Sequence, residues 1–138
     1  MSLVVIGNLL RTTMTAALPN GTFAHVVYDA LDIAALPTSQ RAASITYELG
    51  EFRQVSFGKK RVQSEGIAHI RLYEPSDKGD GGQLTIADRI ALLLTNSSKS
   101  ESGVDLQYRV AGLSNVLRTG AHWERVVRVP FRVTYYLN

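Results

Sequence analysis

The feature that most constrains the fold is a strict alternation of apolar and polar residues near the C-terminus. In an extended segment over residues 123–135, apolar side chains fall on one face and polar side chains on the other. The apolar face holds Trp123, Val127, Val129, Phe131, Val133 and Tyr135, and the polar face holds Glu124, Arg128, Arg132 and Thr134. A period of two is typical of a strand that buries one face. Because Pro130 cannot donate a ladder hydrogen bond, we expect this strand at a sheet edge.

The same alternation occurs in three earlier segments, over residues 43–49, 66–73 and 104–110. The first two are joined through Gly58-Lys59-Lys60, and Val55 and Phe57 continue the apolar set before this basic turn. Two alternating runs joined by a glycine-containing turn predict a β-hairpin. The sequence therefore predicts four strands.

Two other segments have helical spacing. The first, residues 3–18, ends at Pro19-Asn20-Gly21, and its apolar face consists of Leu3, Ile6, Leu10, Met14 and Ala17. The second covers residues 84–96, with Thr85 and Asp88 as a capping box and a stripe of Ile86, Ile90, Leu93 and Leu94. Four strands and two helices predict an α+β fold, an antiparallel sheet of four strands or slightly more with helices packed on one face.

Two segments are less regular. Residues 25–36 fit a helix by the spacing of His25, Asp29 and Asp32, but Ala-His-Val-Val-Tyr at 24–28 fits a short strand equally well. Residues 96–103 are polar and rich in serine, which predicts a linker between the second helix and the next strand.

Length and composition limit the class of protein. A chain of 138 residues makes one domain, here residues 1–138. The absence of cysteine excludes thiol nucleophiles, thiolate metal sites and disulfide scaffolds. No apolar run approaches the ~20 residues that span a bilayer, and the first residues lack the pattern of a signal peptide. We expect the protein to start in a cytoplasm, with no membrane partner.

The net charge of +3 is the sum of larger opposed segments. Residues 1–52 carry −2, 53–73 carry +4, 74–106 carry −3 and 107–138 carry +4. A basic segment beside an acidic one suits contact between identical subunits, but a basic face also suits nucleic acid. Lys59, Lys60 and Arg61 concentrate positive charge at the expected hairpin turn, where a solvated turn is the simplest interpretation.

No motif indicates catalysis. His25, His69 and His122 are isolated, and Asp77 and Asp80 miss the spacing of a calcium loop. Gly79-Asp80-Gly81-Gly82 lacks the residues that complete a phosphate-binding loop, and no GxSxG sequence occurs. We expect no enzyme activity and no cofactor.

The order of these elements resembles the small tail terminator proteins of long-tailed (siphovirus-like) bacteriophages, a family once catalogued as a phage-related domain of unknown function. The resemblance spans nearly the whole chain. It is carried by Pro37, by Gly-Ile-Ala-His-Ile-Arg-Leu-Tyr-Glu-Pro at 66–75, by Ile-Ala-Asp-Arg-Ile at 86–90 and by Trp-Glu-Arg-Val-Val-Arg-Val-Pro-Phe at 123–131. It implies a strand rather than a helix over residues 25–31.

The resemblance further implies a homohexameric ring that caps the finished tail tube, stops its polymerisation and joins the tail to the head connector. Its partners would be copies of itself, the tail tube protein and head-tail connector proteins, with DNA passing through without specific binding. Its place would be the virion, at the head-tail junction, after assembly in the host cytoplasm. A closed ring needs a heterologous interface, and we expect Lys59, Lys60, Arg61, Arg128 and Arg132 at such contacts. The alternatives are another head-tail joining or neck protein and a small basic nucleic-acid-binding module.

Overall fold

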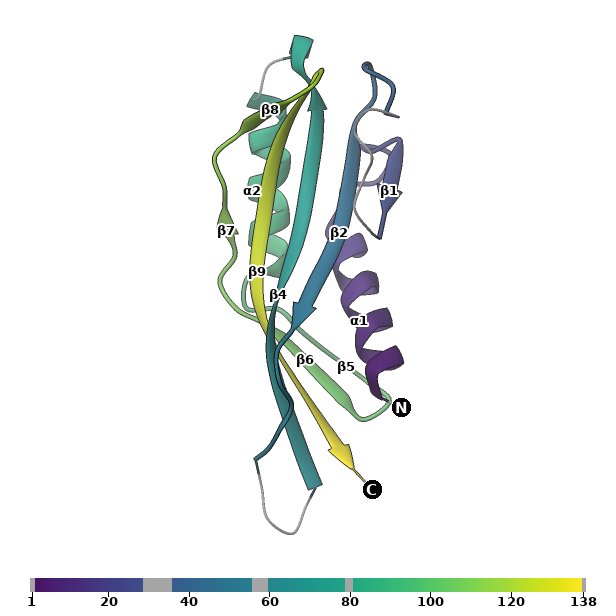
Figure 1. The fold of residues 1–138 in the computed structure, drawn as a ribbon, viewed down its shortest axis with the longest axis vertical. Coiled ribbons are helices and arrows are strands. Elements are labelled where there is room, and N and C mark those ends of the chain that lie inside the picture. The colour runs from purple at the N-terminus through teal and green to yellow at the C-terminus, as the bar shows by residue number, and fades with distance from the viewer. Residues whose placement is uncertain (1, 29–35, 56–59, 79–80, 138) are drawn as a thin grey trace.

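A single curled sheet backed by two helices makes up the fold (Figure 1). The computed structural model describes residues 2–28, 36–55, 60–78 and 81–137. Within them the sheet has nine strands, in the order β1-β2-β4-β9-β6-β5, with β3 beside β4 and with β7 and β8 beside β9. In chain order the elements are α1 (Ser2–Ala16), β1 (His25–Val27), β2 (Ala42–Leu49), β3 (Arg53–Gln54), β4 (Lys60–Pro75), the short 3-10 helix η2 (Ser76–Lys78), α2 (Gly81–Leu94), β5 (Ser98–Glu101), β6 (Val104–Tyr108), β7 (Gly112–Leu113), β8 (Leu117–Thr119) and β9 (His122–Leu137).

The mixed α+β class is confirmed, and the sheet is larger than four strands. The predicted hairpin is confirmed as the antiparallel pair of β2 and β4. Phe57, Gly58 and Lys59, which belong to the predicted turn and the residues before it, lie outside the described residues. Val55 was expected in the apolar set and is instead exposed. The segment 25–36 begins as a strand, since β1 pairs in parallel with β2, and residues 29–35 lie outside the described part.

The last strand is central, so the expectation of an edge strand is wrong. β9 pairs with β4 along its whole length and with β6, β7 and β8 on its other side. Pro130 fits there because its carbonyl oxygen accepts a hydrogen bond from the Arg109 amide at 2.8 Å, so its nitrogen faces the same side of the strand. On that side residues 109–111 stand opposite only Val129 and Pro130, between β6 and β7. Because the ladder is interrupted here, no carbonyl of the neighbouring strand requires a hydrogen bond from the N–H that Pro130 lacks.

The polar segment after α2 is a strand, not a linker. β5 is exposed at all four residues and pairs antiparallel with β6. Ser102 and Gly103 form the two-residue turn between them, with φ of 49° and 77°. Positive φ at both turn residues is typical of the tight turn that matches the twist of a hairpin. The segment was misjudged because an edge strand with both faces in water shows no alternation.

The main core lies between the helices and one face of the sheet, and a small second cluster of Leu36, Ala42 and Tyr73 is buried on the other face. Both helices contribute to the main core, together with alternate residues of β2, β4, β6 and β9. The predicted helix faces are largely confirmed, but Leu3 and Leu93 are 44% and 54% exposed. The capping box is wrong, because α2 begins at Gly81 and the Thr85 hydroxyl donates to the Gly81 carbonyl within the helix, at 3.1 Å. Neither helix in the described part of the chain is long and apolar enough to span a membrane.

Candidate interaction surface

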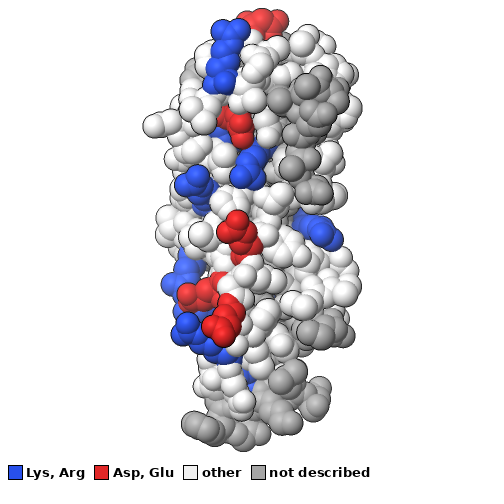
Figure 2. Space-filling view, in the orientation of Figure 1, with Lys and Arg blue, Asp and Glu red and all other residues white. Residues whose placement is uncertain are grey.

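The sheet face turned away from the helices carries charged side chains of both signs. Figure 2 shows them as blue and red groups alternating down the middle of the molecule. They come from the positions that alternate with the core residues on β2, β4, β6 and β9, namely Glu48, Arg61, Glu65, Arg71, Asp105, Glu124, Arg128 and Arg132. We call this surface the open face. Leu36 packs on Ala42 and Tyr73 at one end of this face, while its charged residues Glu48, Arg61, Glu65 and Arg128 are exposed, so the face is a candidate for contact with a partner.

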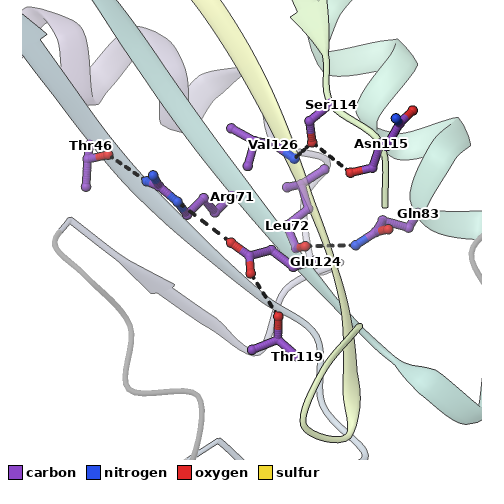
Figure 3. A network of polar contacts seen from close by, with 9 residues as sticks. All are labelled: Thr46, Arg71, Leu72, Gln83, Ser114, Asn115, Thr119, Glu124 and Val126. Atoms are coloured by element: carbon purple, nitrogen blue, oxygen red, sulfur yellow. Dashed lines mark hydrogen bonds and ion pairs between the residues drawn. The ribbon is translucent and has the colours of Figure 1, made fainter. Parts of the chain in front are cut away.

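Near β8, the charges of the open face satisfy one another (Figure 3). The Arg71 guanidinium donates to the Thr46 hydroxyl at 3.2 Å and lies 3.8 Å from the Glu124 carboxylate. The Thr119 hydroxyl donates to the other oxygen of Glu124 at 3.0 Å. The four side chains come from β2, β4, β9 and β8, so this network links neighbouring strands. A face that is internally paired here has little charge left for a ligand.

Further along the face, one carboxylate holds two guanidinium groups. Glu65 Oε1 accepts from Arg109 at 3.1 Å and from Arg132 at 3.2 Å. The three side chains are 63%, 50% and 38% exposed, so water screens both ion pairs. These contacts orient Arg132 more than they stabilise the fold.

The structure brings together part of the predicted contact set. Lys59 lies outside the described residues, and Lys60 is the first residue of β4. Arg61 and Arg132 line one hollow of the open face, described below, while Arg128 lies beyond it, opposite His69. Arg61 and Arg128 are exposed, and neither side chain has an ion-pair or hydrogen-bond partner among the described residues. Within that part of the chain, their guanidinium groups are open to a ligand or partner.

His69 is held neutral by its surroundings. Burial lowers its pKa below the ordinary 6.5, and the neighbouring charge of Arg71 lowers the pKa further. Arg128 acts in the same direction, while Glu48 opposes them. The Nδ1 atom of His69 is buried and has no hydrogen-bond partner within the described part of the chain. A neutral, partly buried imidazole between two arginines adds no charge to the open face near neutral pH.

The other two histidines fasten the turn before β2. His25 Nε2 lies 2.6 Å from the side-chain oxygen of Gln40, and the buried His122 lies 3.0 Å from the Gln40 carbonyl oxygen. No group of three potential metal ligands occurs in residues 2–28, 36–55, 60–78 and 81–137. The expectations of no enzyme activity and no cofactor stay predictions.

Exposed apolar side chains on two sides of the molecule were not anticipated. In Figure 1, α1 and β1 lie on one side of the sheet, and β7 and β8 lie on the other. On the first side Val4 is 67% exposed; on the second, Leu117 of β8 and Val110 before β7 are each 66% exposed. Leu92, on the helix that contacts β7, is 72% exposed. We call these groups the α1 side and the β7/β8 side. In the sequence Val4 and Leu92 lie off the predicted apolar faces of their helices, whereas Val110 belongs to the apolar set predicted for the strand over 104–110 and is exposed instead.

Comparison with known proteins supports the fold alone. No protein-family model matches the chain, and no curated protein matches it significantly. Among solved structures 23 chains match. One of them, whose name states no function, has a TM-score of 0.69 at 13% identity, and the alignment covers 95% of this chain and 97% of the other. At that identity the likeness carries architecture and says nothing of activity or partners.

Proposed function

We propose that this protein is a tail terminator of a long-tailed bacteriophage. It assembles as a ring, expected to be a hexamer, on the end of the completed tail tube, stops polymerisation of the tube and forms the joining surface to the head connector. The resemblance in sequence motivates the proposal. The observation that carries it is the presence of exposed large apolar side chains on both sides of the subunit, Leu3 and Val4 of α1 on one side and Leu92, Val110 and Leu117 on the other.

A closed ring places one surface of each subunit against a different surface of the next. A subunit with apolar patches on two different sides suits that arrangement, because each patch would be covered by the other patch of a neighbouring copy. Soluble monomers bear scattered apolar residues, but apolar side chains gathered on the surface mark contacts. Val4 and Leu92 are the two most exposed large apolar side chains of the α1 side and the β7/β8 side, respectively.

We propose that the charged residues of the predicted contact set bind a partner through their side chains, and not by adding a strand from the partner to β9. β9 is flanked by strands on both sides, so it cannot add a strand from a neighbour. Among the described residues, β1 and β5 end the main strand order, and the short strands β3, β7 and β8 also pair on one side only, so these are the strands with an edge open to pairing. Lys59, Lys60, Arg61, Arg128 and Arg132 remain our proposed contacts with the next subunit, the tube or the connector, through their charges.

The test is electron microscopy of purified protein mixed with tail tubes, using variants that place a charge in each patch. We expect rings on tube ends for the wild type, and at least a tenfold loss of capped ends for Val4→Asp and for Leu92→Asp, since a charge in the centre of an interface is costly. Thr38→Asp adds the same charge in the exposed turn before β2 and is expected to cap as the wild type does.

Other outcomes contradict the proposal. Rings on isolated connectors but never on tubes would favour another neck or head-tail joining protein. Duplex binding that weakens steeply with salt, without any association with tubes, would favour the nucleic-acid-binding module. Equal capping by the three variants would remove the two apolar patches from the interface.

A further inference from the structure

The open face contains a polar hollow near the C-terminal end of β9. Its volume is about 190 Å³. Thr134 lies at its centre, in a cross-strand row with Gln63 of β4 and Asp105 of β6. Thr134 is short and only 7% exposed, and it receives a weak hydrogen bond from Gln63 at 3.4 Å. A short side chain in the middle row forms the floor of the hollow.

Longer side chains surround this floor on the two adjacent rows. Arg61 and Tyr136 form the row on one side, and Arg132 and Gln107 form the row on the other. Side chains two residues apart along a strand lie on the same face, so all four stand around Thr134. The hollow thus has one arginine on each of the two rows that flank Thr134.

Both guanidinium groups have unused donors. The Arg61 side chain has no ion-pair or hydrogen-bond partner among the described residues. Arg132 gives one terminal nitrogen to Glu65, but its Nε is buried and has no partner in the part of the chain that is described. A buried N–H without an acceptor is unfavourable, so a small shift of the Arg132 side chain toward an acceptor in the hollow would satisfy it.

We propose that this hollow binds a phosphate group. Its lining brings together two arginines from the two flanking rows, the hydroxyls of Thr134 and Tyr136 and the amide of Gln107. A tetrahedral anion presents oxygens in several directions. A planar carboxylate is satisfied by the fork of one arginine and leaves the other arginine unused. Phosphate is therefore the chemistry that fits this arrangement.

Asp105 also lines the hollow and opposes an anion. One of its oxygens accepts from the Ser100 hydroxyl at 2.5 Å, which spreads its charge toward β5. Its remaining repulsion weakens phosphate binding and gives the proposal a distinctive test, since Asp105→Asn is expected to tighten binding several-fold while the basic residues are unchanged.

The experiment is a titration of the full chain with inorganic phosphate, followed by two-dimensional NMR of the backbone amides of β4, β6 and β9. We expect Arg61→Gln and Arg132→Gln each to weaken binding about tenfold, the loss typical of one charge-assisted contact. Arg128→Gln is the matched control, because it removes an equally unpartnered arginine from the same face of β9 outside the hollow. It is expected to change affinity less than twofold. Urea midpoints of all variants verify that each is folded.

A second titration distinguishes the source of the phosphate. A short DNA duplex that shifts the same amides, competes with inorganic phosphate and loses affinity with salt identifies a nucleic-acid backbone; binding of inorganic phosphate alone identifies the free ion. Either result supports the site. The proposed site is overturned if neither phosphate nor the duplex binds. It is also overturned if Arg128→Gln weakens binding as much as Arg61→Gln and Arg132→Gln do, or if Asp105→Asn does not tighten binding. The hollow shares Arg61 and Arg132 with the proposed contacts of the ring, and the two proposals are told apart because capping of tubes is measured separately from phosphate binding.

Discussion

Adding one methyl group at Gly66 tests the geometry of the central ladder most sharply. Gly66 lies on the core side of β4, opposite Leu49 of β2 and Phe131 of β9. A Cβ there would clash with the backbone carbonyl oxygen of Glu48 and would lie 2.6 Å from the end of the Phe131 ring. Overpacking of this kind typically costs about 1–3 kcal/mol. Because one obstacle is the backbone of a paired strand, which cannot rotate away, we expect Gly66→Ala to cost about 3 kcal/mol.

The assay is urea unfolding followed by Trp123 fluorescence. With a slope of about 2 kcal/mol per molar urea, a loss of 3 kcal/mol lowers the midpoint by about 1.5 M. Gly112→Ala in β7 is the control, since a Cβ at that position meets nothing within 4 Å, and its midpoint is expected to stay within about 0.3 M. A Gly66→Ala midpoint within the same 0.3 M of the wild type would refute the close approach of β2, β4 and β9.

Three further predictions concern polar groups. Burial raises the pKa of Tyr108 to about 12. An absorbance titration is therefore expected to show one tyrosine that ionises near that pH, and Tyr108→Phe is expected to lack this ionisation. The same variant loses the 2.5 Å contact between the hydroxyls of Tyr108 and Thr13, at a cost of about 1 kcal/mol of stability. The pKa of His69 is below 6.5 in the folded chain, so the unfolded chain binds more protons and urea midpoints fall as pH drops below 6.5; a His69→Gln variant with the same pH dependence as the wild type contradicts this. Glu74 is 4% exposed at its side chain and pairs with Arg41. Arg41→Gln is therefore expected to cost about 2 kcal/mol by leaving a buried carboxylate unpaired, and calorimetry showing an unchanged melting temperature would exclude it.

Segments that bury one face were predictable, because burial imposes a period on the sequence. The alternation over 123–135 and 66–73 gave the central strands, and helical spacing gave α1 and α2. Failures came where that period is absent. β5 has water on both faces, and the position of Pro130 depends on an interruption in a neighbouring strand that no local pattern encodes.

The interaction surface was predictable only in part. Arg128 and Arg132 were expected on the polar face of the last strand and lie on the open face, whereas Arg61 was expected in the hairpin turn and lies on the same face as a residue of β4. Arg61 and Arg132 line the hollow around Thr134, and Arg128 does not. This difference depends on the register of β4, β9 and β6, which the sequence pattern does not encode. The buried Gln83 was not predictable either, because its partners lie on two strands distant in sequence. Its side-chain amide donates to the Leu72 carbonyl and to the Trp123 carbonyl, at 2.8 Å each.

The central claim is that this subunit closes into a ring on a tail tube. Negative-stain microscopy of the purified protein mixed with tail tubes tests it most directly. We predict rings of six subunits on tube ends and tubes that no longer elongate when tube protein is added. Tubes with bare ends that continue to elongate in the presence of saturating protein would contradict the claim.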